Sequence, residues 1–333
     1  MLLSLVGIAA LALLSIYCGS HLSVTNANNF LNGSSEEMLQ LTSDQAYVMP
    51  IVSSVFLLML FFFFTYVQYV LTFLIICLAG MTLYINLHHL LDYIAFIPQK
   101  IKLAVSYLFP FICILEWLRS GNFLAHDIIG CSTCITLIAT LQFPSLKIAS
   151  ICLVGLLLYD IFWVFLSQYI FNKNVMLEVA TKDTVNPIQS TGEYFHIPYF
   201  ENFQITLSLP IKLIFPVEGD KSFIMLGLGD IALPGMLIAY ALRCDKDFEA
   251  EQLKTDLEAP TSSSGIVQTK LFEHCLLSYL VGLAMAFYCS FHWNHAQPAL
   301  LYLVPAVLIP IFWISSRHGR LASVWNGAKL TRS

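Results

Sequence analysis

Long apolar runs separated by shorter polar segments divide this chain of 333 residues. A helix that crosses a bilayer needs roughly 20 apolar residues, and nine runs of about that length are present. They cover residues 2–18, 48–66, 68–87, 102–118, 122–142, 146–171, 222–242, 271–291 and 296–315. The pattern therefore predicts an all-α polytopic membrane protein, with about nine transmembrane helices in one membrane-embedded domain over residues 1–333.

The polar segments between these runs are expected to lie outside the bilayer. They are a loop at 19–47, a long loop at 172–221 between the sixth and seventh spans, a flexible loop at 244–270 and a tail at 316–333. The third of these is rich in acids and contains the Pro- and Ser-rich sequence 259–265, which is typical of an exposed linker.

Composition supports a membrane protein and narrows the chemistry. Hydrophobic residues make up 58% of the chain and charged residues only 11%, too few for a soluble domain. The net charge of -5, without a basic cluster, argues against nucleic acid as a partner. No four-ligand metal set is evident, and the cysteines lie mostly inside apolar runs, so neither a metal, another cofactor nor a disulfide framework is predicted.

Lysine and arginine residues predict the orientation. With nine spans the two termini lie on opposite faces. If the N-terminus is luminal, the cytosolic segments hold 11 of the 16 basic residues and the luminal segments hold 5, as the positive-inside rule requires. The N-terminus is therefore expected in the lumen and the C-terminus in the cytosol. The sequon at Asn32 would then face the cytosol and stay unglycosylated.

Two aspartates lie within apolar runs, Asp160 in 146–171 and Asp230 in 222–242. Carboxylates at membrane depth are rare and usually functional. The helical rise places them roughly 16 Å and 12 Å from the luminal ends of two antiparallel neighbours, which are similar depths. Two facing buried carboxylates cannot both ionise, so they share one proton. The pair then offers an acid and a base side by side.

The backbone around Asp230 is expected to be open. Gly227 and Gly229 would each lower the stability of a helix by roughly 1 kcal/mol relative to Ala at the same interior position. Pro234 has no N–H, and it therefore leaves the carbonyl of Asp230, four residues earlier, without a helical partner. Small side chains and a free carbonyl would let water or another backbone approach the carboxylate, as hydrolysis of a peptide bond requires.

Three motifs carry a family resemblance. Tyr159-Asp160, Gly227-Leu228-Gly229-Asp230 and Pro298-Ala299-Leu300 resemble, in order, the YD, GxGD and PAL motifs of the intramembrane aspartyl proteases, the signal peptide peptidase and presenilin group. The similarity covers about residues 140–310. It implies that the two aspartates activate a water against a peptide bond, and that the PAL residues help to shape the site. Tyr159 is expected either to pack or hydrogen-bond beside the pair, or to be an ordinary aromatic residue of the span.

Within this family, residues 61–68 and 167–176 resemble the signal-peptide-peptidase-like proteases of type three. That resemblance implies type II membrane proteins as substrates, with Golgi glycosyltransferases and glycan-modifying enzymes as candidates, and release of their ectodomains. It also implies residence in the Golgi or endoplasmic reticulum (ER), with the bilayer as partner and a homo-oligomer as one option. Alternatives are a signal peptide peptidase that clears signal-peptide remnants in the ER, a proton-coupled transporter or channel, and a non-catalytic scaffold.

Two further patterns allow more than one interpretation. Residues 204–209 alternate polar and apolar, which predicts a short strand that would pair with an unwound substrate or remain a strand without a partner. Glu116 and Arg119 lie close in sequence to His126 and Asp127. These four are expected to form either a mutually satisfied polar cluster near the membrane surface or part of a proton path.

Overall fold

The computed structural model describes residues 2–31, 39–92, 94, 96, 98–172, 175–181, 208–216, 223–258, 270–293 and 297–327. The chain divides into two compact units. Unit 1 contains residues 1–15, 56–136 and 175–228, and unit 2 contains residues 16–55, 137–174 and 229–333.

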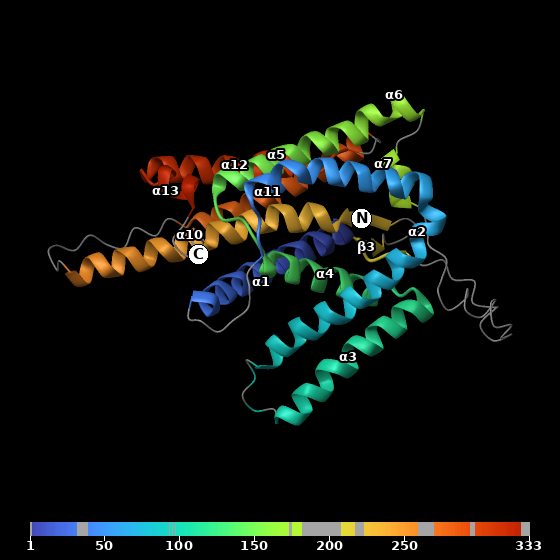
Figure 1. Ribbon diagram of the computed structural model, residues 1–333, viewed down its shortest axis with the longest axis horizontal. Coiled ribbons are helices and arrows are strands. Elements are labelled where there is room, and N and C mark those ends of the chain that lie inside the picture. Colours follow the sequence, from blue (N-terminus) through green and yellow to red (C-terminus); the bar gives the residue numbers. More distant parts are fainter. Residues whose placement is uncertain are drawn as a thin grey trace. The chain divides into compact units, whose positions relative to one another are not determined.

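Helices dominate the described residues (Figure 1). The longer ones are α1 (Leu2–Leu31), α2 (Ser43–Asp92), α3 (Gln99–Ser120), α4 (Phe123–Thr140), α5 (Leu146–Ile161), α10 (Leu228–Glu258), α11 (Leu271–Trp293) and α12 (Leu300–Arg317). The short ones are the π-helix η1 (Phe162–Leu166), α6 (Ser167–Phe171), α7 (Val175–Thr181) and α13 (Leu321–Asn326). Among the described residues, seven helices are long and apolar enough to cross a membrane. The predicted class, an all-α polytopic membrane protein, is confirmed.

The second and third predicted spans are two helices that follow each other directly across a kink within α2. Together they have 50 residues, enough at the helical rise to cross a hydrocarbon layer of about 30 Å twice. The one residue of α2 with non-helical dihedral angles is Phe63, at φ -116° and ψ 20°. The chain thus changes direction within an apolar stretch that contains no polar loop, which is why the sequence pattern showed only a narrow gap between 66 and 68.

The predicted loop at 19–47 is wrong over much of its length, because α1 continues to Leu31 and α2 begins at Ser43. Ile16, Ser20, Ser23 and Ala27 are all fully buried, at the spacing of one helix face. Small polar residues therefore pack inside unit 2 instead of forming a loop. The sequon at residues 32–34 lies outside the described residues.

Two other predicted polar segments also contain helices. α10 runs through Glu258, so the predicted loop at 244–270 is wrong over residues 244–258, while 259–269 lie outside the described residues. One contact holds the helical part of this segment in place: Asp245 Oδ2 accepts the backbone N–H of Phe272, at the start of α11, at 2.9 Å. In the predicted tail 316–333, α13 is anchored by the Tyr240 hydroxyl, which donates to the Val324 carbonyl oxygen at 2.6 Å.

Unit 1 holds the only antiparallel strand pair among the described residues. β3 (Lys212–Pro216) pairs with β4 (Phe223–Gly227), with Ile214 opposite Met225. β4 occupies the first residues of the predicted span 222–242, and α10 begins directly after it. The predicted strand at 204–209 is not observed at Ser208 and Leu209, and 204–207 lie outside the described residues. The predicted loop 172–221 thus contains α7 and β3.

In the same unit, the second half of α2 lies beside α3 (Figure 1). Their shared core contains Leu83, Cys113 and Trp117, together with Ile129 of α4. The outer faces are strongly apolar, with Tyr66 79% exposed and Phe73 65% exposed on α2. Such rows of exposed aromatic side chains are expected where lipid replaces water as the surrounding medium.

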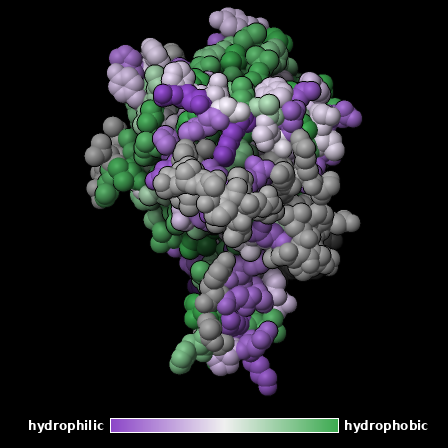
Figure 2. All heavy atoms as spheres, turned by 90° about the vertical axis from the view of Figure 1, so that its left-hand side faces the viewer, coloured by the Kyte–Doolittle hydropathy of each residue, from purple (hydrophilic) through white to green (hydrophobic). Residues whose placement is uncertain are grey.

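Unit 2 is built around α10. Residues 236–245 of this helix are all buried; 236–242 are apolar on all sides of the helix, as expected for a buried segment, and Arg243 and Asp245 are buried charged residues. α12 packs against both α5 and α11, and the two-residue strands β1 (Leu39–Gln40) and β2 (Leu141–Gln142) pair in parallel. Figure 2 looks at the end where the charged second half of α10 and α13 lie, and hydrophilic side chains gather there.

Candidate active site

Asp160 lies on the inward face of the helix that begins with α5. Its side chain is only 3% exposed, and it continues a buried stripe that includes Cys152 and Leu156 at helical spacing. Directly after it the helix widens into the π-helical turn η1, from Phe162 to Leu166. Single π-turns inside α-helices are uncommon and are frequent at functional sites.

The PAL sequence supplies a hydrogen-bond donor to this carboxylate. The backbone N–H of Leu300 donates to Asp160 Oδ2 at 3.4 Å. Leu300 begins α12, and an N–H in the first turn of a helix has no partner within that helix. The preceding Pro298 accepts the N–H of Leu301 through its carbonyl oxygen, which starts the helix at this point. Pro298 and Ala299 thus place a free N–H and the positive end of a helix beside a buried acid.

Asp230 lies in the first turn of α10 and is half-buried. Its carboxyl interacts electrostatically with that of Asp160, so the structure brings the two predicted acids together within unit 2. The depth estimate that suggested this pairing was wrong for Asp230, because residues 223–227 form a strand, which rises about 3.3 Å per residue. Beside Asp230, a Cβ added at Gly229 would meet no atom within 4 Å.

A tyrosine that the sequence analysis did not single out donates a hydrogen bond to the backbone of this turn. The hydroxyl of Tyr279 in α11 donates to the carbonyl oxygen of Asp230 at 3.3 Å. Pro234 deprives this carbonyl of its helical donor, as predicted, and a side chain from another helix supplies the replacement. The free carbonyl could be read from the sequence, whereas its donor depends on how α11 packs against α10.

We expect Tyr279→Phe to lower any activity that depends on Asp230 by about three- to thirtyfold. The change removes one hydrogen bond, worth roughly 1 kcal/mol net, and leaves a buried carbonyl unsatisfied, which costs about 1–3 kcal/mol. The first turn of α10, which carries Asp230, would then be held less firmly. Activity per folded molecule, measured with purified protein in lipid nanodiscs, checks this expectation.

A second substitution tests whether the hydrogen bond itself is responsible. Pro234→Ala restores an N–H that can donate to the Asp230 carbonyl within α10. In the Tyr279→Phe background it should recover most of the lost activity, which makes the two effects non-additive. Full additivity of the two substitutions would show that Tyr279 acts in some other way.

The remaining predicted residues are placed as follows. Tyr159 is half-buried, and its ring centroid lies 6.5 Å from that of Trp163, one helical turn later. Gly227 ends β4 and Leu228 begins α10, where the Leu228 N–H donates to the Ile211 carbonyl oxygen at 3.0 Å. Both belong to unit 1 and lie just before Gly229 along the chain.

Comparison with known proteins finds a match to the signal peptide peptidase family model over residues 33–331. The protein named signal peptide peptidase-like 1 of Oryza sativa subsp. japonica is 32% identical over 321 residues, which cover 89% of this chain and 84% of the relative. Its Arabidopsis thaliana namesake is 32% identical over 324 residues, covering 89% and 85%. Signal peptide peptidase-like 3 of Oryza sativa subsp. japonica is 28% identical over 313 residues, covering 87% of this chain and 52% of the relative.

These relatives carry different type numbers at similar identity, so the resemblance to type three stays a prediction. The matched residues 33–331 include Asp160, Asp230 and Pro298–Leu300, the groups that meet in unit 2.

Proposed function

Because this chain belongs to the signal peptide peptidase family, a family of intramembrane proteases, we propose that Asp160 and Asp230 are the catalytic pair of an aspartic endopeptidase. One observation carries the proposal: two acids from separate helices interact, and one of them accepts an N–H from the start of a third helix. One carboxylate would activate a water as general base, while the other, protonated, would polarise the scissile carbonyl. Tyr159, Gly227, Leu228, Gly229, Pro234, Pro298, Ala299 and Leu300 would shape the site.

The hairpin β3–β4 offers an edge for an unwound substrate. The Leu228 N–H donates to the carbonyl oxygen of Ile211, so these two residues form a hydrogen-bonded pair. Hydrogen-bonded and non-hydrogen-bonded pairs alternate along an antiparallel ladder, and Ile214 and Met225 are therefore a non-hydrogen-bonded pair. The N–H of each points away from the other strand. The outward N–H of Ile214 is taken by Asp127, and the carbonyl of Pro216 accepts from Ser4 Oγ. None of the described residues bonds to the outward groups of Met225. An extended substrate would therefore add to β4, the strand that leads along the chain to Asp230.

The substrate class follows from the type three resemblance. We propose type II membrane proteins, cleaved within or near their transmembrane segment so that the ectodomain is released, with Golgi glycosyltransferases and other glycan-modifying enzymes as candidates. Clearance of signal-peptide remnants in the ER is the alternative within the family. The proposed location is the membrane of the Golgi or ER.

The proposed orientation rests on the distribution of lysine and arginine, which places the N-terminus in the lumen and the C-terminus in the cytosol. The sequon at Asn32 then faces the cytosol. Loss of mass on endoglycosidase treatment of the wild-type chain, but not of Asn32→Gln, would contradict this orientation.

A purified chain in nanodiscs tests the proposed reaction. It is incubated separately with a type II reporter and with a signal-peptide reporter, and the products are identified by mass spectrometry. We expect the type II reporter to be cut within or beside its apolar segment. Cutting of the signal peptide alone would favour the ER alternative. Proton flux across liposomes without any cut product would favour a transporter.

A further inference from the structure

His126 and Asp127, at the start of α4, are buried polar residues that the proposed chemistry does not use. They are 1% and 5% exposed. The prediction that they form one cluster with Glu116 and Arg119 is wrong. Those two side chains are exposed, and Glu116 accepts a hydrogen bond from Ser120 one turn later. The pair on α4 turns inward instead, toward the segment that leads into β3.

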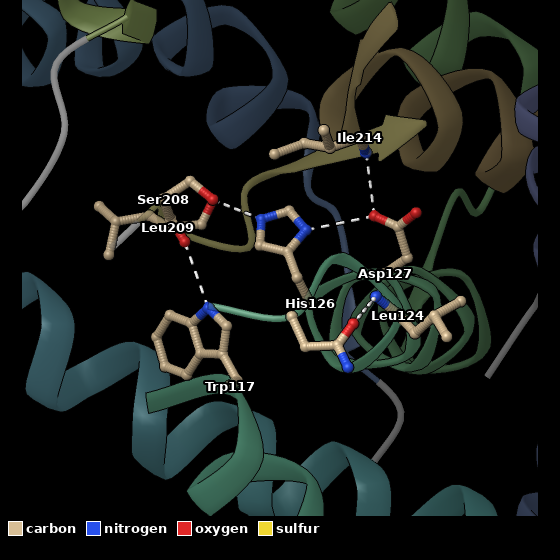
Figure 3. Close-up of polar contacts among 8 residues, drawn as sticks. Trp117, Leu124, His126, Asp127, Ser208, Leu209 and Ile214 are labelled. Atoms are coloured by element: carbon tan, nitrogen blue, oxygen red, sulfur yellow. Dashed lines mark hydrogen bonds and ion pairs between the residues drawn. The ribbon is translucent and has the colours of Figure 1, made fainter. Parts of the chain in front are cut away.

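Side chains of α3 and α4 hold the backbone of this segment (Figure 3). His126 Nε2 lies 3.1 Å from the carbonyl oxygen of Leu209, and its Nδ1 lies 3.2 Å from Asp127 Oδ1. The same Oδ1 accepts the N–H of Ile214, the middle residue of β3, at 2.9 Å. Trp117 Nε1 donates to the carbonyl oxygen of Ser208 at 3.3 Å. The backbone of residues 208–214 is thus held at three points by side chains of unit 1.

Donor counting shows what this network requires. Both ring nitrogens of His126 face oxygen atoms, Nε2 the carbonyl oxygen of Leu209 and Nδ1 the Oδ1 of Asp127. Asparagine at position 127 would keep the oxygen that this network uses. Its Oδ1 takes the place of the carboxylate oxygen that faces both the Ile214 N–H and His126 Nδ1, and an amide oxygen has two lone pairs with which to accept. The geometry therefore needs an acceptor oxygen at residue 127, which Asn supplies and Leu does not.

The position of the acceptor on the hairpin indicates its role. Asp127 occupies the outward N–H of Ile214, the edge of β3 that faces away from β4. One helical turn along α4, Gly130 lets Leu213 approach closely, since an added Cβ would lie 3.0 Å from Leu213 Cδ2. The same helix thus contacts the middle of β3 at Leu213 and Ile214 and occupies one outward N–H on the edge of β3.

We propose that His126 and Asp127 are positioning residues that set the place of the β3–β4 hairpin and close its β3 edge, so that substrate pairs with β4 in one register. This inference rests on the proposed function, because the register matters only if the hairpin receives a substrate. The pair acts through the hairpin and takes no part in hydrolysis.

The test compares the intact chain with Asp127→Leu and Asp127→Asn in nanodiscs, with Glu116→Gln as the exposed control. Hydrogen–deuterium exchange of the peptide over residues 208–216 reports on the hairpin without any substrate. Mass spectrometry of the released reporter gives the cut positions. For Asp127→Leu we expect exchange at Ile214 to be about tenfold faster and the cuts to spread over neighbouring bonds. Asp127→Asn should match the intact chain in both measurements.

Two outcomes would overturn the proposal. The first is unchanged exchange and unchanged cut positions in Asp127→Leu. The second is loss of cleavage in Asp127→Asn with slow exchange retained, which would favour the proton path. If Asp127→Leu does not fold, Ile214→Pro breaks the same hydrogen bond by removing its donor, the N–H of residue 214. Pro is tolerated in a strand where the N–H points away from the partner strand. If the intact chain cuts no reporter, the proposed function fails, while the exchange measurement still decides whether the pair holds the hairpin.

Discussion

Replacing either Asp160 or Asp230 by Asn is expected to lower ectodomain release at least about a hundredfold, since a positioned acid or base contributes roughly 10²–10⁴-fold to rate. Asn is nearly isosteric with Asp, and at residue 160 its Oδ1 can still accept the N–H of Leu300. The fold should therefore persist while the chemistry is lost. Release of a type II reporter, measured in cells that lack their own relatives of this protease, checks the expectation at equal protein levels.

The control for this prediction is Asp92→Asn, which removes an acid at the exposed end of α2, where it meets His88 and Lys102. Its release should equal that of the intact chain. Two acids that act as one unit give non-additive losses, so the double variant should be no worse than either single one. Undiminished release in both single variants would refute the assignment of a protease that uses this pair.

Gly229→Val is expected to lower cleavage by about a hundredfold with little change in stability. Gly229 is exposed, its φ is not positive, and an added Cβ meets no atom within 4 Å, so the protein itself has room for a side chain. If the substrate backbone passes here, a valine would hold it away from Asp230, and a misplacement of about 1 Å can cost about 10²-fold in rate. Turnover and thermal unfolding of the purified variant are the measurements.

Gly235 provides the matched contrast on the same helix. An added Cβ there would lie 2.6 Å from Ile138 Cδ1, so Gly235→Ala should overpack the core of unit 2 and cost about 1–3 kcal/mol of stability. The two variants should therefore differ in what they lose. Gly229→Val keeps its unfolding temperature and loses turnover, whereas Gly235→Ala unfolds at a lower temperature. Equal thermal losses in both would mean that Gly229 is a packing residue.

Apart from the predicted span 222–242, which is not among the seven helices of the described residues apolar enough to cross a membrane, the apolar helices and the acid pair were accessible from the sequence, because both depend on composition over many residues. A carboxylate within twenty apolar residues stands out whatever the tertiary structure is. The freed carbonyl of Asp230 was equally accessible, since Pro234 removes a donor at a fixed offset. Its partner Tyr279 was not, because no sequence rule relates the two positions across the packing of α10 and α11.

The errors have a common physical origin in short stretches that suit two structures. Residues 223–227 are an apolar run of five that fits the start of a buried helix as well as a strand, and only pairing with β3 decides between them. Ser20 and Ser23 seemed polar enough for a loop, yet their small side chains allow close packing, and Ser23 Oγ accepts from the buried Arg243. Tertiary contacts decided each case.

The alternation along β4 limits how the chain can vary in length. Ile224 and Leu226 are buried, while the side chains of Phe223 and Met225 are about half exposed. One residue inserted within β4 would exchange the two faces and turn the other set of backbone groups outward. An insertion between Pro216 and Phe223 lies outside both strands and would leave the register of β3 and β4 unchanged. Insertions and deletions among homologues are therefore expected before Phe223 and not between Phe223 and Asp230.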